Sequence, residues 1–581
     1  MKRSRYLIAG GLLVLGLICG PLWSTAKETE SPEKTAVAKV TGAELFQREW
    51  LPGDTRSHGG DGLGPVFNDS SCVACHNQGG VGGGGPLGKN VNIISAVMNH
   101  SVTPVVRFRP QRSVPEQLFR SLIGLDDNAV QPQMVKISDE AVAKRRKQLI
   151  EEVAAIHPGF RTAGSVVVHH GSTADGYPVW RSKFLTNSFN QFQSMQAFPA
   201  ANPMGMMNEP FAGGGVAGDV VVFAEEAVFA EEEAVFEEAL PQTQVAQPMQ
   251  HSVDWQALNS AKMQARHVGN QVMQHGHFTV TVTQRNPTAL FGVGAMDQVS
   301  DEAIEAAAKR KHEKFPEVSG RVARLADGRI GRFGWKAQKA TLEDFTLTAC
   351  AVELGLNVPG HAQSGNPLDP EYTTEGYDLT KAECDSLVNY LHNLPTPTKN
   401  QPAEKPLMEY LSTGEHLFEQ VGCATCHTPE LGDAKDIYSD LLLHDMGAEL
   451  GDTGSYGVFV PNSPGSEDAS PVPQLTELKR MMQPVQQPAV SFGAQGEQTQ
   501  EAKIIGALQQ EWRTPPLWGV RDSAPYMHDG RADTLEQAIA LHGGEGSRSA
   551  QLFFSLKPAQ RLQLISFLKS LSAPTGELAA R

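Results

Sequence analysis

Residues 72–76 read CVACH and residues 423–427 read CATCH, so the pattern C-x-x-C-H occurs twice in the chain. The pattern is the signature of covalent c-type haem attachment, because two thiols at this spacing reach the two vinyl groups of the porphyrin. The histidine that follows is then placed beneath the iron as its proximal ligand. A zinc site or a redox dithiol does not require a His directly after the second Cys. The sequence therefore predicts two covalently bound c-type haems, attached at Cys72, Cys75, Cys423 and Cys426 and ligated by His76 and His427.

The composition limits the partners that the protein can have. The chain has 581 residues, which is enough for two to four domains. It carries 49 basic and 65 acidic residues, a formal net charge of -16. This charge argues against a nucleic-acid partner. We expect a redox partner protein, such as a small cytochrome, to dock with a basic face.

The N-terminal segment has the pattern of an export signal. Residues 2–5 carry three positive charges, residues 7–22 form an uncharged apolar run, and residues 24–26 are small. We interpret residues 1–26 as a signal peptide and residues 27–40 as a polar tether. The alternative is an uncleaved anchor that holds the protein at a membrane. Either interpretation predicts a periplasmic or otherwise exported protein, which suits covalent haem.

Similar elements flank the two haem motifs in the same order. The pattern G-x-x-L-F occurs at residues 42–46 and again at 414–418, ahead of each motif. Amphipathic helices with Leu or an aromatic residue at i, i+3, i+4 and i+7 are predicted near residues 387–394 and 564–571, each followed by a proline. Thr341 and Thr534 both precede Leu-Glu and are predicted N-caps. The order indicates an internal duplication.

The predicted fold class is mainly α, with two cytochrome c-like haem modules over residues 41–397 and 405–575. The first module carries a large insertion with some short strands. A charged helix is expected at 140–156 and strands at 165–173 and 277–284. A low-complexity stretch lies at 186–250, where Val-Phe pairs alternate with acidic residues; we interpret it as solvated, with protein docking as the alternative.

Several longer blocks resemble a known family. These are GDGLGPVFNDSSCVACHN (60–77), RNPTALFGVGAMDQVSDEAI (285–304), RFGWKAQKATLEDF (332–345), YSDLLLHDMGAEL (438–450) and RTPPLWGVRDSAPYMHDGRADTLEQAIALHGGE (513–545). In this combination and order the chain resembles the bacterial di-haem oxidoreductases, some of which are labelled thiol oxidoreductases and which are relatives of the di-haem cytochrome c peroxidases. The resemblance covers most of the chain beyond the N-terminal segment.

The resemblance implies a sixth ligand for the second haem. In the peroxidases an axial Met follows the Y-[MF]-H-D-G block, and the corresponding place here holds His542. We therefore expect His427 and His542 to ligate the second iron, a pair that favours the ferric state. The competing ligands nearby are His444, Met446, Met527 and His528, of which His528 is expected to bind a propionate or a loop.

The first haem has no clear sixth ligand in the sequence. The peroxidases place a distal His soon after the first motif, and the candidates here are Met98 and His100. They also use a Trp between the haems, whereas no Trp lies between His76 and Trp180. Trp335 is expected to pack in the core, with a relay role as the alternative.

Cys350 and Cys384 are the other cysteines beyond the signal segment, and they leave three roles open. They could form a structural disulfide in an oxidising compartment, they could carry thiol redox chemistry, or Cys350 could be a soft ligand of the first haem.

These patterns predict redox chemistry in which electrons enter through one haem and leave through the other, to a small oxidant or a partner protein. A peroxidase would also need an acid that assists O–O cleavage, and no such residue is identified. The rival functions are a non-catalytic electron carrier, with both irons six-coordinate, and a docking component of a larger redox assembly.

Overall fold

The structure is a computed structural model that describes residues 40–99, 138–185, 252–266, 271–325, 327–397, 399, 402–454, 471–472, 475–482 and 510–574. The described residues belong to one compact unit that begins at Val40. Four expectations lie outside them: the signal peptide 1–26, nearly all of the tether 27–40, the low-complexity stretch 186–250, and His100. No helix within the described ranges has the length and apolar character needed to cross a membrane.

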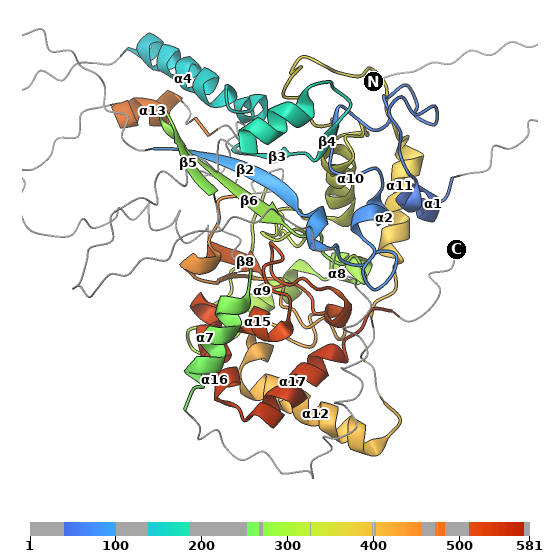
Figure 1. Ribbon diagram of the computed structural model, residues 1–581, viewed down its shortest axis with the longest axis vertical. Helices are drawn as coiled ribbons and strands as arrows, with labels where there is room; N and C mark the ends of the chain where they lie inside the picture. Colours follow the sequence, from blue (N-terminus) through green and yellow to red (C-terminus); the bar gives the residue numbers. More distant parts are fainter. Residues whose placement is uncertain are drawn as a thin grey trace, which may run out of the picture. The chain divides into compact units, whose positions relative to one another are not determined.

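Helices outnumber strands in the described part of the chain (Figure 1). Before residue 400 they are α1 (Gly42–Gln47), α2 (Cys72–Cys75), α4 (Asp139–Ala154), α7 (Trp255–Gln264), α8 (Val293–Asp297), α9 (Asp301–Ala308), α10 (Leu342–Glu353) and α11 (Lys381–His392). After residue 400 they are α12 (Lys405–Gln420), α13 (Leu475–Met482), α15 (Leu535–Ala540), α16 (Ser547–Ser555) and α17 (Pro558–Lys569). Short 3-10 turns are η1 (Leu87–Lys89), η2 (Pro158–Arg161), η3 (Cys423–Thr425), η4 (Ala448–Leu450), η5 (Val520–Asp522) and η6 (Gly544–Gly546).

The main sheet is antiparallel and has the strand order β3-β2-β6-β5. Its strands are β2 (Val91–Met98), β3 (Ser165–Val168), β5 (Gln271–His275) and β6 (Phe278–Arg285). Small two-stranded pairs join β1 (Val66–Phe67) to β4 (Gly171–Ser172) and β7 (Leu443–Asp445) to β8 (Glu511–Arg513). The expected strands at 165–173 and 277–284 are therefore present, whereas the longest partner, β2, was not predicted.

Both faces of the main sheet are covered. Ile94, Ala96 and Met98 of β2 pack into one core with α4, which lies over the sheet in Figure 1. Ile93 points to the opposite face because side chains alternate along a strand, and there it packs with Val167 and beside Val352 of α10. The sheet therefore ties the expected insertion to the helices near the first haem motif.

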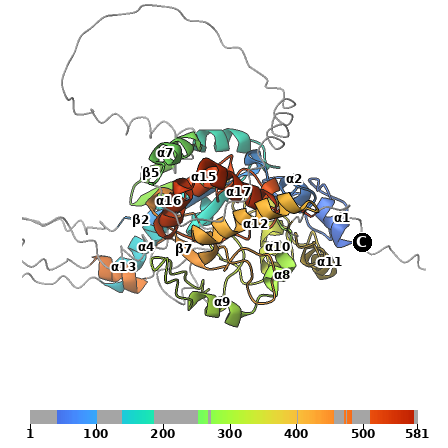
Figure 2. The same cartoon turned by 90° about the horizontal axis from the view of Figure 1, so that it is seen from below.

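Two helix pairs cross closely, one beside each haem motif. Helix α1 packs on α11, and α12 packs on α17, which Figure 2 shows side by side. A Cβ atom at Gly42 would lie 2.0 Å from the Ser386 carbonyl oxygen, and one at Gly414 would lie 2.1 Å from the Gln563 carbonyl oxygen. The first glycine of each G-x-x-L-F pattern thus sits where only a hydrogen fits.

The predicted N-caps are confirmed. The Thr341 hydroxyl accepts a hydrogen bond from the Asp344 backbone N–H at the start of α10. The Thr534 hydroxyl accepts one from the Gln537 backbone N–H at the start of α15. The fold is mainly helical with some strands, as expected; the internal duplication and the module boundaries at 41–397 and 405–575 stay predictions.

The chain crosses those boundaries in space. Helix α7 precedes β5 in the sequence, yet it packs against α15 and α16 near the other end of the chain (Figure 1). Its Leu258 is buried in the same core as Phe553 and Phe567. The insertion therefore supplies part of the core around the second haem motif.

Candidate haem sites

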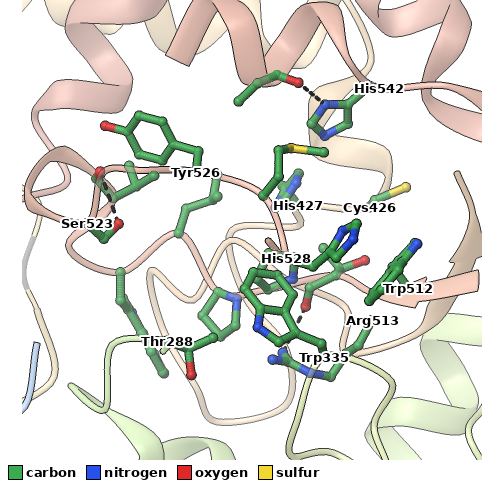
Figure 3. Close-up of a pocket in the computed structure, with 18 of the residues that line it drawn as sticks. Thr288, Trp335, Cys426, His427, Trp512, Arg513, Ser523, Tyr526, His528 and His542 are labelled. Carbon is green, nitrogen blue, oxygen red and sulfur yellow. Dashed lines mark hydrogen bonds between the residues drawn. The ribbon is translucent and has the colours of Figure 1, made fainter. Parts of the chain in front are cut away.

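A cavity of about 280 Å³ lies beside the second C-x-x-C-H motif. Cys423, Cys426 and His427 line one side, and His542 lines it from the end of α15 (Figure 3). Most of the remaining wall is apolar, including Phe418, Leu517, Val520, Tyr526, Leu535, Ala538, Ile539 and Leu568. The sequence brings His427 and His542 to one cavity although 114 residues separate them.

Hydrogen bonds fix the tautomers of both cavity histidines. His427 Nδ1 donates to the Tyr438 carbonyl oxygen at 2.9 Å, and His542 Nδ1 donates to the Ala538 carbonyl oxygen at 2.7 Å. Each proton on Nδ1 leaves a lone pair on Nε2, which is the form that ligates iron. Burial lowers the pKa of His427 to about 4 and also lowers the pKa of His542. Both imidazoles are therefore neutral and ready to bind a metal.

The first motif places its histidine in the same way. Ser71 caps α2 by accepting a hydrogen bond from the Ala74 N–H. His76 Nδ1 then donates to the carbonyl oxygens of Thr288, at 3.0 Å, and Gly83, at 3.2 Å. Burial lowers the pKa of His76, so its Nε2 also carries a lone pair.

The glycine-rich loop at 79–85 folds back around this histidine. A Cβ atom at Gly83 would lie 1.7 Å from the Gln78 carbonyl oxygen, and one at Gly85 would lie 2.6 Å from the Cys75 carbonyl oxygen. The glycines serve the close approach of the backbone that brings the Gly83 carbonyl to His76.

The thiols of both motifs are free to react. Cys72, Cys75, Cys423 and Cys426 are unbridged. Burial raises the pKa of Cys72 and of Cys423 to about 12, so these groups are neutral thiols in the structure. Neutral thiols, a histidine with a free Nε2 and an apolar cavity fit a haem.

A polar wall closes one end of the second cavity. Arg513 lines it, and its guanidinium is held by the carbonyl oxygens of Gly334 and Thr514 (Figure 3). Beside it the imidazole of His528 stacks on Trp512 with ring centroids 3.8 Å apart. A buried guanidinium suits a carboxylate such as a haem propionate.

His528 is committed to packing and to an acid rather than to the centre of the cavity. Its Nε2 lies 3.4 Å from Asp452 Oδ2, and Asp452 pairs with Arg285 at 2.7 Å, both almost fully buried. Trp335 packs edge-on against His528, and its indole N–H donates to the Asn286 carbonyl oxygen at 3.0 Å. The expected packing role of Trp335 agrees with these contacts.

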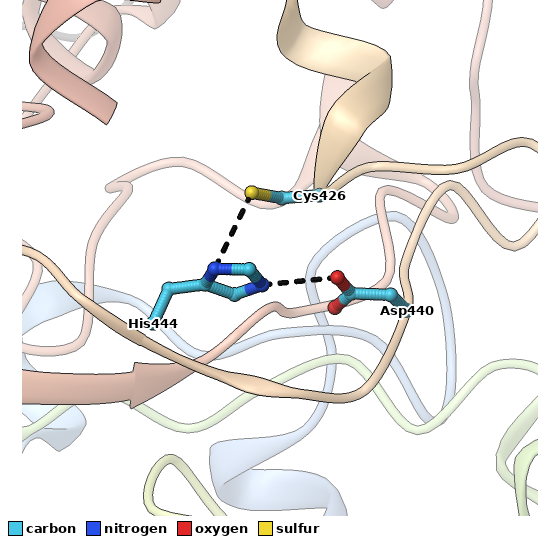
Figure 4. Close-up of side chains that lie close together, drawn as sticks. All are labelled: Cys426, Asp440 and His444. Carbon is cyan, nitrogen blue, oxygen red and sulfur yellow. Dashed lines mark hydrogen bonds and ion pairs between the residues drawn. The ribbon is translucent and has the colours of Figure 1, made fainter. Parts of the chain in front are cut away.

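His444 is engaged at both ring nitrogens. Nε2 donates to Asp440 Oδ2 at 2.9 Å and Nδ1 donates to Glu545 Oε2 at 2.7 Å, while Cys426 Sγ lies 3.6 Å away (Figure 4). Burial opposes protonation, but hydrogen bonds to Asp440, Cys426 and Glu545 raise the pKa of His444 far above its usual value. Both ring nitrogens of His444 are therefore engaged by carboxylates, which disfavours His444 as a ligand of the iron.

The remaining candidate ligands differ in where their side chains lie. Met446 and Met527 line the second cavity and stay as competing thioethers. Met98 packs in the core between β2 and α4, away from any ligand role. Cys350 and Cys384 are free and buried in one core, beside which Cys72 packs. Burial raises the pKa of both thiols, which makes Cys350 a poor thiolate ligand.

The carbonyl acceptors and Arg513 were missed in the sequence. Tyr438, Ala538 and Thr288 act through backbone oxygens, which any residue type supplies. Arg513 opens the RTPPLWGV block, and that block was the one available signal.

The two C-x-x-C-H motifs, each with a histidine that keeps a lone pair on Nε2, are suited to holding two haems. Residues 496–571 match the family model described as "Di-haem oxidoreductase, putative peroxidase". The resemblance to the di-haem oxidoreductases seen in the sequence is thus supported over this C-terminal part of the chain.

Three curated relatives match parts of the chain. Hydrazine synthase subunit gamma of Kuenenia stuttgartiensis is 28% identical over 217 residues, 35% of this chain and 53% of that protein. Methylamine utilization protein MauG of Methylorubrum extorquens is 24% identical over 159 residues, covering 26% and 32%. Cytochrome-c peroxidase IdrP2 of Pseudomonas sp. is 30% identical over 166 residues, covering 27% and 38%. The chain thus spans about half or less of the length of these relatives.

Two solved structures also match. A hydrazine synthase of Kuenenia stuttgartiensis has a TM-score of 0.23 and 16% identity, covering 61% of this chain and 100% of that one. A MauG-like protein associated with microbial copper homeostasis has a TM-score of 0.23 and 18% identity, covering 48% and 90%.

Proposed function

We propose that this protein is an exported di-haem c-type cytochrome with oxidoreductase activity of a peroxidase-like kind. One observation carries the proposal: His427 and His542 both donate through Nδ1 to backbone carbonyls and line one cavity with Cys423 and Cys426. A haem bound there supplies one-electron chemistry. The thioether bonds to the four motif cysteines belong to the same proposal.

The second site is suited to electron transfer. Two neutral imidazoles, His427 and His542, would hold the iron of a haem bound there and would leave no position for a small substrate. Paired imidazoles favour the ferric state more than a His and Met pair does. Arg513 at the polar end of the cavity would hold a propionate of that haem.

The first site is suited to a small oxidant. His76 would hold the first iron on one side; of the two candidates for the other side, Met98 is packed in the sheet core and His100 lies outside the described residues. The similarity to a protein named cytochrome-c peroxidase and the family's peroxidase description support a peroxidase-like reaction at this iron. No side chain of the described residues is assigned as the catalytic acid.

The location and the partner follow from the sequence. The segment 1–26 has the pattern of an export signal, which supports a periplasmic location. The net charge of -16 supports docking of a small basic cytochrome as the electron donor or acceptor.

Two measurements on the oxidised protein test the proposal: a covalent haem count by intact mass, and an electron paramagnetic resonance spectrum. We expect two haems, one low-spin signal from the second site and one high-spin signal from the first, together with turnover of peroxide. Two low-spin signals without peroxide turnover would favour a non-catalytic electron carrier. Fewer than two haems would overturn the proposal.

The substitution His542→Ala tests the ligand pair. It should convert the low-spin signal of the second site to high-spin without changing the haem count. His416→Ala is the matched control, because that side chain is 74% exposed on α12. An unchanged low-spin signal in His542→Ala would assign the sixth position to Met446 or Met527.

A further inference from the structure

The segment 286–290, which reads NPTAL, lies between the two haem sites. All five of its residues line the cavity of the second haem. On its other side the segment is hydrogen-bonded to the loop that follows the first motif: the Gly85 N–H donates to the Pro287 carbonyl at 3.0 Å, and the Leu290 N–H donates to the Gly82 carbonyl at 2.7 Å. This short segment therefore lines the cavity of the second site and is hydrogen-bonded to the loop of the first site.

The same segment holds the ligand of the first iron. The Thr288 carbonyl is the nearer of the two acceptors for His76 Nδ1, at 3.0 Å against 3.2 Å for Gly83. A stronger donation from Nδ1 makes Nε2 more basic and stabilises ferric iron. The position of Thr288 thus bears on the potential of the first haem.

Asn286 fixes where the segment lies. It is 6% exposed and uses its backbone and side chain in four hydrogen bonds. Toward the second site, its N–H donates to the His528 carbonyl at 2.8 Å and its carbonyl accepts from Trp335 Nε1 at 3.0 Å. Toward the first site, its Nδ2 donates to the Gly85 carbonyl at 3.0 Å and to Asn90 Oδ1 at 2.9 Å.

The second-haem side of these bonds consists of residues that line the cavity. Trp335 and His528 are both part of its wall. Asn90 reinforces the link, because its own Nδ2 donates to the Asp529 carbonyl, next to His528, at 2.8 Å. A displacement of that wall is therefore transmitted through Asn286 to Thr288.

We propose that Asn286 is a positioning residue that holds the Thr288 carbonyl against His76 and so makes the hydrogen bond of the first haem's ligand depend on the wall of the second haem's cavity. The inference rests on the proposed function, because it requires a haem at each motif. The second site has no equivalent, since His427 and His542 bond to Tyr438 and Ala538 within their own part of the chain.

The test is Asn286→Ala, which removes both side-chain hydrogen bonds and keeps both backbone ones. We expect the midpoint potential of the first haem to rise and its iron–histidine stretching frequency in the resonance Raman spectrum to fall. The potential of the second haem should change less, because its two histidines are held by the carbonyls of Tyr438 and Ala538. A redox titration followed by electron paramagnetic resonance assigns each midpoint to its haem.

Two further variants keep the test decisive. Asn366→Ala is the matched control. Asn366 is also buried, and its side chain accepts a hydrogen bond from the Leu368 N–H within its own turn. Both potentials in this variant should match those of the native protein. Trp335→Phe keeps a ring and removes the donor to the Asn286 carbonyl, and it should shift the first potential in the same direction by less. Trp335→Phe replaces Asn286→Ala as the test if Asn286→Ala does not fold.

The outcomes separate the inference from the function on which it rests. A native protein with fewer than two haems overturns the proposed function. Two haems in every variant, with a first-haem potential in Asn286→Ala and Trp335→Phe equal to that of Asn366→Ala, overturns the positioning role alone. Equal shifts of both haems would indicate general loosening and would also overturn it.

Discussion

The two C-x-x-C-H sites share a motif but differ in what completes them. At the second motif both imidazoles come from residues after 420, and each is held by a carbonyl of that same region. At the first motif the described residues supply one histidine, and a carbonyl 212 residues away holds it. The second site is built locally, with two histidines at one cavity. The first depends on a remote segment of the chain.

The structural elements around the two motifs also differ. The second motif is enclosed by helices α12, α15, α16 and α17, with α7 added from the insertion. The first is joined through the segment 286–290 and α10 to a four-stranded sheet. One site is thus a helical enclosure, and the other is an interface between helices and a sheet.

Removal of the attachment thiols should give the largest effect and would test the difference directly. In Cys423→Ala with Cys426→Ala we expect the covalent haem count to fall from two to one, because both thioether bonds are lost. The first haem should keep its spectrum, apart from a shift in potential. Intact mass and electron paramagnetic resonance measure both. Cys350→Ala with Cys384→Ala is the control and should retain two haems; loss of both haems in the motif variant would contradict the separate attachment of the two haems.

The second largest effect is expected at the buried ion pair of Arg285 and Asp452, which joins the sheet to the second cavity. Arg285 Nη1 and Nη2 each lie 2.7 Å from one Asp452 oxygen, with the two side chains 6% and 1% exposed. Asp452→Asn leaves a buried guanidinium uncompensated, so we expect the free energy of unfolding to fall by about 3–5 kcal/mol. Chemical denaturation measures it.

The control for that pair is an exposed one. Glu430 and Lys435 are 58% and 63% exposed, and Glu430→Gln should cost less than about 1 kcal/mol. Equal losses in Asp452→Asn and Glu430→Gln would mean that the link between the sheet and the second cavity contributes no more than a surface ion pair.

The glycines at the two helix crossings test how far the sites are alike. Gly42→Ala and Gly414→Ala each force a Cβ atom against a backbone oxygen, and each should lower the free energy of unfolding by about 1–3 kcal/mol. Gly365→Ala is the control, because a Cβ there has no neighbour within 4 Å. Similar losses support two helix pairs of one design; a loss at one crossing alone would argue against the duplication.

Short-range patterns could be predicted from the sequence. The motif cysteines, the N-caps at Thr341 and Thr534, and the helices around 140–156, 387–394 and 564–571 follow from spacing within a few turns of chain. The position of His542 came from the family resemblance, and the structure places it at the cavity.

Long-range arrangements could not be predicted. Strand β2 needed its partner β6, which lies almost two hundred residues away, before its apolar run had a sheet to join. The packing of α7 on α15 leaves no local pattern, and neither does the pairing of Arg285 with Asp452. Backbone carbonyls that hold His76, His427 and His542 have no sequence signature at all.

The smallest effect is expected from the buried histidines that do not belong to the haem motifs. It concerns the pH dependence of the stability of the fold. Burial lowers the pKa of His157, beside the sheet, to about 3, whereas carboxylates keep His444, beside the second site, protonated. A lowered folded-state pKa means that the unfolded chain binds the extra proton below pH 6.5. His157 therefore lowers the stability of the fold as the pH falls, by at most about 1.4 kcal/mol per pH unit.

His157→Asn keeps an acceptor for the Gly159 N–H and cannot titrate. Thermal unfolding between pH 7 and pH 5 should therefore show a shallower decline for this variant than for the native protein, despite some lost packing at pH 7. An unchanged decline would mean that His157 is not the group whose protonation destabilises the sheet region, and the contrast between a neutral histidine there and a charged one beside the second site would not hold.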